Sequence, residues 1–497
     1  MDNSPKPKRR RGRRDESTTT PPKSSSSPSS APKENSPSAP KSGRKRDLPK
    51  KGDEGYLSPT QLRNRRKRKK QKRDKDDDAG AGGDGEGEKS EEVKVKKKKK
   101  KKPTKGPGNP DQKYIRQPLK CPIVLSAQSH FSSTTPPTPY PITLGPLTRW
   151  RNISKLPCRS INGSIKFGLF QPGTHSMNAK SSQSPAHHPK INEAILFMEK
   201  GCGECEVKAY EEKDGEGELK FVIFNIDRKE EKVQITLVLN LTKDEELPAS
   251  LVELSKKLKA WESLSSLFLH YNKAWKHSNA IFNFSPDSWN HLHGPQAIVE
   301  TLPMKEEMPY SVNLRFPPNV FRQANGVAFT KIIERVRELM PERGKSQVVE
   351  LYGGVGTIGL HLLDKCSSLI SSDENPNNVK AFNDAVKELP KKLRKKPRYE
   401  QLSAEDMVKQ GHLNSESKVD VVVVDPPRKG CDDVVIKAIN ECAAAKTLVY
   451  VSCGFEAFVR DQKSLEEEGK WRLKVAEGFV LFPGADAVET LAVFERY

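Results

Sequence analysis

Short apolar runs alternate with segments of helical spacing over the last third of the chain. The runs are rich in Val, Ile, Leu and Tyr, and they occupy residues 347–352, 368–373, 398–403, 420–425 and 447–452. Strands that alternate with helices are typical of a parallel sheet with helices on both faces. We therefore predict a parallel sheet with covering helices in this part of the chain.

Two further strand-like runs follow, at 473–482 and 489–497. They are joined by the short turn Pro483-Gly484-Ala485-Asp486, which is too short for a parallel crossover and predicts an antiparallel hairpin. Parallel strands closed by such a hairpin resemble the seven-stranded Rossmann-like methyltransferase architecture. The predicted fold class is α/β, with this domain spanning residues 321–497.

Residues 113–320 have a mixed pattern. Strand-like runs at 221–226 and 233–241 precede helical spacing from Pro248 to Leu267, where apolar residues recur every three or four positions. The pattern predicts a separate α+β domain.

Residues 1–112 contain almost no apolar side chains, so little burial would offset the entropy of ordering them, and we expect a disordered tail. Residues 1–110 hold 35 Lys+Arg and 16 Asp+Glu, a net charge of +19 out of +22 for the whole chain. The basic runs at 8–14, 65–70 and 96–102 are suited to RNA phosphates and to nuclear import. A nuclear or nucleolar location is favoured, cytoplasmic or organellar placement stays open, and a merely solubilising tail is the alternative.

The cysteines and the apolar content exclude some classes of protein. Eight cysteines without regular spacing do not form the framework of a small secreted domain, and a reducing compartment is expected. No apolar run reaches 18 residues, so no membrane association is expected. Cys202 and Cys205 have metal-ligand spacing, but Cys121 and Cys158 are too isolated to complete a site. We expect no metal.

A glycine-rich turn follows the first strand. It contains GxGxxG at Gly354, Gly356 and Gly359, where missing side chains let a ligand approach the backbone at a helix start. Asp373 ends the second strand, where a carboxylate can accept hydrogen bonds from ribose hydroxyls. A solvated loop acid is the alternative for Asp373, and the turn alone is compatible with NAD, FAD or S-adenosylmethionine.

Asp425 begins the tetrapeptide Asp-Pro-Pro-Arg directly after a run of four valines. This places it at the carboxyl edge of the sheet, where ligands bind in open α/β folds. Amino-directed methyltransferases have an aromatic residue after Pro-Pro, but Arg428 occupies that position. Cytosine-C5 RNA enzymes have a cysteine just after the proline, and none is present here.

Cys453 and Glu489 could carry out covalent chemistry at the same edge. C5 of uracil is too weak a nucleophile to attack a sulfonium methyl, but a thiolate that adds to C6 generates a nucleophilic enolate. A base must then remove the C5 proton, and Glu489 at the start of the last strand is the best candidate. Taken singly, a buried apolar cysteine and an ordinary hairpin acid remain the alternatives.

Together these residues resemble the RNA uracil-5-methyltransferase family that modifies tRNA and rRNA. The resemblance runs from FRQAN at 321–325 through ELYGGVGTIGL, DPPRKG and YVSC to FPGADAVETLAVFER, and weakly includes Trp150-Arg151-Asn152 and 165–175. It implies a Cys453 nucleophile and a Glu489 proton acceptor, forming 5-methyluridine with S-adenosylmethionine as methyl donor. Structured RNA, tRNA or rRNA, would be the partner, bound by residues 113–320, and the protein is expected to be a monomer. The donor would be bound by Gln323, Tyr352, Gly354, Gly356, Asp373 and Asp425.

Two departures from the family pattern leave alternatives open. Gly454-Phe455 replaces the usual Asn-Pro after the nucleophile, and Gly353 replaces a cysteine in the glycine turn. A catalytically inactive RNA-binding or assembly protein with the same fold is therefore the main alternative. An NAD-dependent oxidoreductase is a third reading that explains only GxGxxG.

Overall fold

The computed structural model describes residues 112–170, 177–178, 183–273, 281–282, 285–305, 308–341, 345–467 and 469–497. The chain divides into two units, 1–98 and 99–497, and all the described residues belong to the second. The predicted disordered tail, apart from Gln112, lies outside the described residues. Residues 171–175 of the 165–175 motif also lie outside them.

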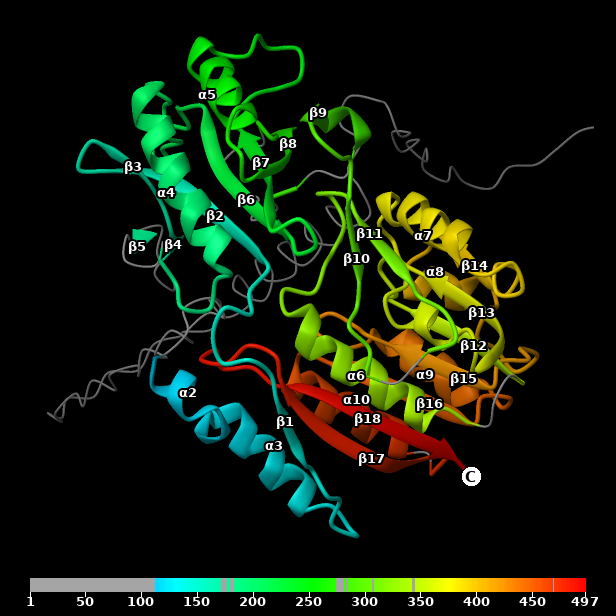
Figure 1. Ribbon diagram of the computed structural model, residues 1–497. Coiled ribbons are helices and arrows are strands. Elements are labelled where there is room, and N and C mark those ends of the chain that lie inside the picture. The colour runs from blue at the N-terminus through cyan, green and yellow to red at the C-terminus, as the bar shows by residue number, and fades with distance from the viewer. Residues whose placement is uncertain are drawn as a thin grey trace, which may run out of the picture. The chain divides into compact units, whose positions relative to one another are not determined.

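The carboxyl third forms a mixed sheet that contains all the predicted strands (Figure 1). Its strands are β12 (Ser346–Leu351), β13 (Cys366–Ser372), β14 (Pro397–Glu400), β15 (Val421–Val424), β16 (Thr447–Ser452), β17 (Trp471–Val480) and β18 (Glu489–Arg496). The first five pair in parallel, and β18 lies antiparallel between β16 and β17. The α/β fold and the closing hairpin are confirmed.

The expected strand count of seven was too low. β1 (Ile142–Leu144) pairs in parallel with β17, so the sheet has eight strands in the order β1-β17-β18-β16-β15-β12-β13-β14. A three-residue strand has too few positions to show a period of two, so its pattern could not be recognised in the sequence.

Helices cover both faces of this C-terminal sheet. They are α6 (Gly326–Leu339), η4 (Gly359–Leu362), α7 (Asn377–Glu388), α8 (Ala404–Lys409), α9 (Asp433–Glu441) and α10 (Phe455–Glu466). All four valines of β15 are completely buried, and they alternate between two cores: Val421 and Val423 pack in one, Val422 and Val424 in the other. Successive strand residues point to opposite faces, so this unbroken apolar run requires helices on both sides.

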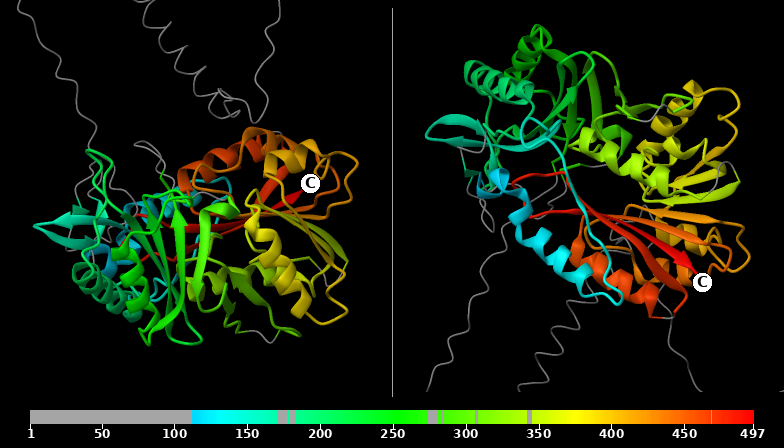
Figure 2. Two further views of the ribbon diagram at one scale, coloured as in Figure 1. Left: turned by 90° about the horizontal axis from the view of Figure 1, so that it is seen from above. Right: turned by 60° about the horizontal axis from the view of Figure 1, so that its bottom comes forward.

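The central part forms a second sheet, in the order β3-β2-β6-β7-β8-β9 (Figure 2). Its strands are β2 (Ile153–Ile161), β3 (Ser164–Phe167), β6 (Leu219–Asp227), β7 (Lys232–Leu239), β8 (Leu264–Tyr271) and β9 (Trp289–His293). The helices α4 (Pro189–Glu204) and α5 (Ala249–Lys259) share a core with this sheet, and β4 (Leu169–Phe170) pairs with β5 (Met177–Asn178).

The helix expected over 248–267 was too long. It ends at Lys259, and Leu264 begins strand β8. Trp261 and Leu264 continue the helical spacing by coincidence, because Trp261 stacks on Phe197 of α4 at 4.6 Å between ring centroids, while Leu264 packs in the central core.

Two parts of the 113–320 segment pack against the C-terminal sheet rather than the central one. The first comprises α2 (Gln112–Arg116), η1 (Pro118–Lys120), α3 (Pro122–Ser132) and β1, whose buried side chains join the core beneath α10. The second is the hairpin of β10 (Ile298–Thr301) and β11 (Asn313–Phe316), which shares a core with α6. The boundary between the two domains therefore does not follow a single position in the chain.

Arg322 connects the two domains. Its buried guanidinium donates to Glu300 Oε2 at 2.9 Å, to the Ile226 carbonyl at 2.8 Å and to the Asn225 side chain, both on β6. This buried ion pair and its hydrogen bonds to β6 join the two segments, while Arg322 Nη2 has no hydrogen-bond partner among the described residues.

Arg322→Ala is predicted to destabilise the protein by about 3–5 kcal/mol, because it leaves the buried Glu300 carboxylate without its main partner. Urea unfolding followed by circular dichroism measures this. Arg472→Ala, which removes an exposed arginine of β17, is the matched control and should change the free energy of unfolding by less than about 0.5 kcal/mol. Equal effects of the two substitutions would contradict the linking role of Arg322.

Candidate active site

The predicted site residues converge at one edge of the C-terminal sheet. Tyr352, Asp373, Asp425 and Cys453 each follow the last residue of a parallel strand, β12, β13, β15 and β16 respectively. The carboxyl ends of parallel strands meet at one edge, which is where open α/β folds bind ligands. Sequence reasoning thus located this edge correctly.

The pairing of β16 with β18 brings Cys453 to Glu489. Ser452 pairs with Thr490 in this antiparallel ladder, and one further step in the same register places Cys453 opposite Glu489. Directly opposed residues project from the same face of a sheet, with Cβ atoms roughly 4.5–5.5 Å apart. The charge of the Glu489 carboxyl group also raises the pKa of the Cys453 thiol, so the two groups lie near each other at this edge.

Burial dominates the electrostatics of these groups. Glu489 is 5% exposed, and burial, together with the negative charge of Asp425, raises the pKa of its carboxyl to about 8. Desolvation raises the pKa of Asp425 to about 7, with a further contribution from Glu350. Glu489, Asp425 and Glu350 are all poorly solvated here, which disfavours their charged forms. Glu489 and Asp425 can therefore bind or release a proton near neutral pH.

Cys453 is partly exposed, and its Sγ lies 4.0 Å from the carbonyl oxygen of Pro426. Desolvation, followed by the charges of Glu489 and Asp425, raises the pKa of its thiol to about 12, while Arg428 acts in the opposite direction. The thiol is therefore protonated when the neighbouring carboxylates are charged. Removal of its proton needs added positive charge or a base at this edge.

The glycine turn folds around a buried carboxyl group that sequence reasoning missed. Glu350 accepts hydrogen bonds from the Gly359 backbone N–H at 2.8 Å and from Ser371 Oγ at 2.6 Å. A Cβ atom at Gly353 would lie 2.7 Å from Glu350 Oε2 and 2.4 Å from Ser371 Oγ. The absence of a cysteine at position 353 therefore follows from local packing. The one sequence signal that could have pointed to Glu350 was a charged residue within an otherwise apolar strand.

The outer part of the turn is open. Gly354 and Gly356 have φ of +56° and +80°, and a Cβ atom at Gly354 would meet nothing within 4 Å. The Gly354 backbone N–H donates to Asp373 Oδ2 at 3.3 Å, and the Asn375 backbone N–H donates to Oδ1 at 2.9 Å. Asp373 is thus fixed beside exposed backbone, with room for a ligand to approach.

Gly454 allows the loop after β15 to approach the end of β16 next to Cys453. A Cβ atom at this position would lie 2.3 Å from the carbonyl oxygen of Arg428, a backbone atom that cannot move alone. The replacement of Asn-Pro by Gly454-Phe455 is therefore accommodated by closer packing of the loop. It removes no chemical group from the site.

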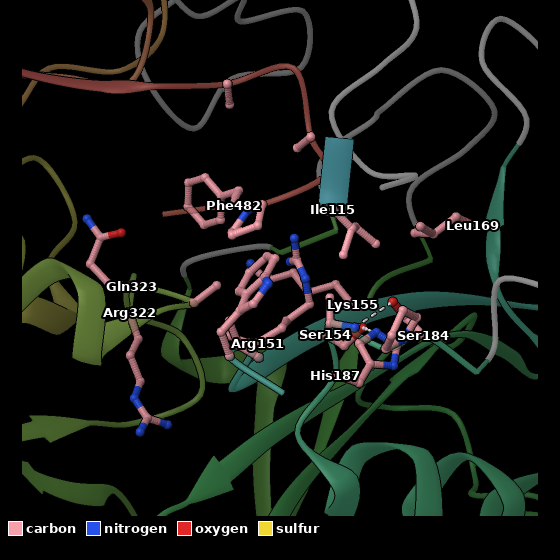
Figure 3. A pocket seen from close by; sticks show the side chains of 18 of the residues that line it. Ile115, Arg151, Ser154, Lys155, Leu169, Ser184, His187, Arg322, Gln323 and Phe482 are labelled. Atoms are coloured by element: carbon pink, nitrogen blue, oxygen red, sulfur yellow. Dashed lines mark hydrogen bonds between the residues drawn. The ribbon is translucent and has the colours of Figure 1, made fainter. Parts of the chain in front are cut away.

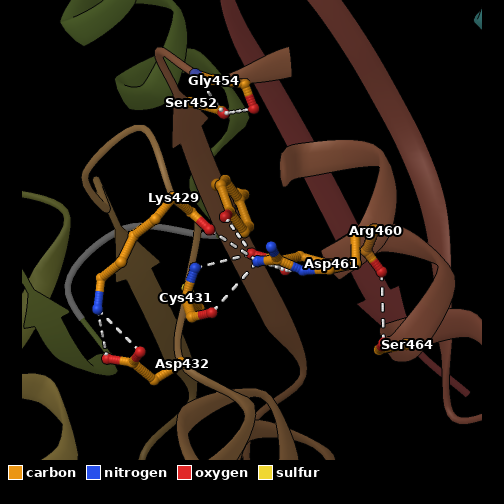
Figure 4. Close-up of polar contacts among 9 residues, drawn as sticks. Lys429, Cys431, Asp432, Ser452, Gly454, Arg460, Asp461 and Ser464 are labelled. Carbon is orange, nitrogen blue, oxygen red and sulfur yellow. Dashed lines mark hydrogen bonds and ion pairs between the residues drawn. The ribbon is translucent and has the colours of Figure 1, made fainter. Parts of the chain in front are cut away.

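Asp461 on α10 anchors the same loop (Figure 4). Its carboxylate is 2% exposed and accepts from Tyr450 Oη at 2.7 Å and from the Cys431 backbone N–H at 2.8 Å. Arg460 pairs with it and donates to the Lys429 carbonyl at 2.9 Å. Sequence reasoning missed Asp461, because an acid on an amphipathic helix carries no signal of what it contacts.

Gln323 lies on a cavity of about 430 Å³ beside this edge (Figure 3). The cavity is also lined by Arg428 and Ala487, and across it by β2 residues including Lys155 and by the adjoining Arg151. None of the described residues that line it is acidic. Arg151 lies 4.8 Å from the ring centroid of Trp150, and burial lowers the pKa of its guanidinium to about 10.

The structure assigns no ligand role to the other cysteines. Cys158 and Cys202 are fully buried in the central core together with Cys205, and burial raises the pKa of the Cys202 thiol. Among the described residues, no three His, Cys, Asp or Glu side chains are arranged to hold a metal ion. Within the same residues, no helix has the length and apolarity needed to cross a membrane.

Comparison with known proteins identifies the family. The tRNA (uracil-5-)-methyltransferase family model matches residues 293–496. An uncharacterised RNA methyltransferase of Protochlamydia amoebophila is 32% identical over 355 residues, covering 71% of this chain and 87% of that protein. A second, from Halalkalibacterium halodurans, is 29% identical over 357 residues, covering 71% and 72% of the two chains.

A solved structure shares the fold. The tRNA (uracil-54, C5)-methyltransferase of Pyrococcus abyssi, crystallised with S-adenosyl-L-homocysteine, matches with a TM-score of 0.56 at 20% identity, covering 75% of this chain and 82% of that one. The predicted resemblance is confirmed: this chain belongs to the tRNA (uracil-5-)-methyltransferase family of RNA methyltransferases.

Proposed function

We propose that the protein uses S-adenosylmethionine to methylate C5 of a uridine in tRNA or rRNA through a covalent adduct with Cys453. The observation that carries the proposal is the cross-strand placement of Cys453 and Glu489 beside Asp425 and Arg428. Covalent C5 methylation needs a thiol and a base on one pyrimidine ring, and this edge brings the two groups together. The main alternative, an inactive relative, loses its support because Gly454 fits the loop that packs on it.

The reaction balances with these two residues. The Cys453 thiolate forms a bond to C6 of uracil, and the electron pair of the C5–C6 double bond moves into an enolate. C5 would then take the methyl group of the donor, whose bond to the sulfonium sulfur would break and leave a neutral thioether. Glu489 removes the C5 proton, the double bond re-forms, and the C6–S bond breaks to return the thiolate. A carboxylate with a pKa near 8 binds this proton more readily than an ordinary glutamate.

The glycine turn and its neighbours fit the methyl donor. Gly354 leaves backbone open to a ligand, while Gly356 lets the turn pack closely on the Phe382 ring. Asp373 follows the adjacent strand with its carboxylate fixed by two backbone N–H groups. When bound, S-adenosylmethionine supplies an electrophilic methyl group on a positive sulfonium, whose charge favours the ionised forms of nearby groups. We assign Asp373 to the ribose hydroxyls, and Tyr352, Asp425 and Gln323 to the remainder of the donor site.

The cavity between β2 and the 482–487 loop supports an RNA substrate. Arg151, Lys155 and Arg428 give it positive charge, and Trp150 and Phe482 give it aromatic surface. Cations with aromatic side chains suit single-stranded nucleotides, which stack on rings and present phosphates. A flipped uridine would enter from this cavity. The basic runs of the tail would add affinity for structured RNA and direct a monomeric protein to the nucleus or nucleolus.

Cys453→Ala is predicted to abolish formation of 5-methyluridine and of the covalent adduct. Transcribed tRNA containing 5-fluorouridine is the trap, because fluorine at C5 leaves no proton for Glu489 to remove. Wild-type protein with S-adenosylmethionine should give an RNA complex that resists denaturing electrophoresis. The matched control is Cys205→Ala, which changes a cysteine of the central domain. This variant should form the covalent complex with 5-fluorouridine RNA as the wild-type protein does. An adduct with Cys453→Ala would overturn the assignment.

The rate of methylation is predicted to rise with pH between about 6.5 and 9. Glu489 must be ionised to accept the proton, and with a pKa of about 8 its charged fraction increases through this window. The Cys453 thiolate fraction rises in the same direction, because its pKa of about 12 lies above the window. The measurement is kcat/KM against pH with labelled methyl donor. A profile that falls from pH 7 to 9 would contradict these roles.

Asp373→Ala is predicted to weaken S-adenosylmethionine binding by about 10- to 100-fold, the effect of losing hydrogen bonds to a charged group. Isothermal titration calorimetry of the full chain measures this without any turnover. The control is Glu374→Ala, which removes the adjacent exposed carboxylate. If both variants bind the donor equally well, the ribose contact lies elsewhere.

A further inference from the structure

The segment from α2 to β1 lies against the loop that leads into Glu489. Figure 2 shows α3 running beside α10, and the buried side chains of Val124, Ala127 and Phe131 pack in one core with Val488. Ile115 of α2 lines the same cavity as Ala485 and Ala487 of the loop. Residues from the start and the end of the described chain therefore build one wall of the site.

The first contact is between the loop and the start of α3. This helix begins with Pro122, and its N-cap residue, Cys121, provides no side-chain cap. Instead, Asp486 Oδ1 accepts a hydrogen bond from the Ile123 backbone N–H at 3.2 Å and another from Cys121 Sγ at 3.2 Å. A carboxylate at this position satisfies an orphan donor and interacts favourably with the helix dipole. Asp486 thus caps a helix 363 residues away in sequence.

The second contact holds the first residues of strand β18. Tyr140 Oη lies 2.8 Å from Thr490 Oγ1, and the Tyr140 ring stacks on Phe131 at 4.5 Å between centroids. Glu489 and Thr490 are neighbours on a strand, so their side chains point to opposite faces of the sheet. Tyr140 therefore holds the strand from behind Glu489. Gly478 of β17 permits this approach, since a Cβ atom there would lie 2.9 Å from the Tyr140 ring.

The two contacts lie on either side of Glu489 in sequence. Asp486 precedes it by three positions, and Thr490 follows it directly. The loop before Asp486 contains a glycine with φ of +90°, Gly484, and the Ala485 backbone N–H donates to the Phe482 carbonyl there. The segment from 112 to 144 thus supports the chain on both sides of Glu489, in addition to the pairing of β18 with β16 and β17.

We propose that this segment positions the proton acceptor, with Asp486 and Tyr140 as positioning residues that act through Glu489. The inference rests on the proposed function and adds a role to residues outside the sheet edge. Asp486 and Tyr140 would affect only the removal of the C5 proton. Thiol addition and methyl transfer depend on Cys453 and the donor, whereas removal of the C5 proton depends on where the Glu489 carboxylate lies.

A displaced base gives a specific signature. The adduct forms and receives its methyl group. It then accumulates, because the C6–S bond breaks only after the C5 proton leaves. Asp486→Ala and Tyr140→Phe should therefore accumulate a covalent complex with ordinary uridine RNA, which the wild-type protein releases. A variant that is only less stable would lower the rate of every step equally and would not accumulate the covalent complex.

The experiment compares full-length variants in two assays with labelled S-adenosylmethionine and transcribed tRNA. Single-turnover methyl transfer to RNA should stay within about twofold of wild type, while steady-state turnover should fall by about 10- to 100-fold, as expected for a misplaced catalytic group. Asp486→Asn keeps an oxygen acceptor for the Ile123 N–H and should recover most of the turnover. His130→Ala removes the contact of α3 with Gln462, away from the loop, and should not accumulate the complex.

Each outcome decides a different claim. Accumulation of the complex with Asp486→Ala, rescue by Asp486→Asn and normal release by His130→Ala support the positioning role. Normal turnover by Asp486→Ala and Tyr140→Phe, or equal accumulation by His130→Ala, would overturn it while leaving Cys453 chemistry intact. Failure of the wild-type protein to trap 5-fluorouridine RNA would instead refute the proposed function itself.

Discussion

The antiparallel pairing of β18 with β16 is the constraint on which the rest of the site depends. Without this inserted strand, the thiol after β16 would lie at the end of a parallel strand with no carboxyl group opposite it. The ladder continues from Thr447 and Glu495 to Ser452 and Thr490, so many backbone hydrogen bonds fix the register. A slip of one residue would turn Glu489 to the other face. The relative position of the Cys453 thiol and the Glu489 carboxyl group is therefore set by backbone pairing.

Burial then gives these groups their chemical character. Glu489, Asp425 and Glu350 crowd one edge of the sheet, and desolvation raises the pKa of each of them toward or above 7. The same surroundings disfavour the Cys453 thiolate, so the thiol is protonated in the free protein. We infer that positive charge from a bound donor and from Arg428 shifts this balance when substrates are present. A reactive thiolate would then form only in the assembled complex.

Sequence reasoning succeeded where a residue's position within a regular element determined its place. The period of the strands located the carboxyl edge, and the short turn after β17 placed Glu489 beside Cys453. It failed where position depended on contacts between distant segments. Asp461, Asp486 and β1 gave no local signal, because an acid in a helix or loop, or a strand of three residues, has many possible partners. The helix predicted after Pro248 was too long for a different reason: apolar residues at helical spacing continued by chance into strand β8.

We propose that the thiol of Cys453 and the carboxyl group of Glu489 act on the same pyrimidine ring. Glu489→Gln tests it most directly, with ordinary uridine RNA and S-adenosylmethionine, followed by nuclease and protease digestion and mass spectrometry of the peptide that contains Cys453. We expect a stalled adduct in which Cys453 carries a uridine nucleotide that has already gained its methyl group. Free turnover by Glu489→Gln, or an adduct on any other residue, would contradict it.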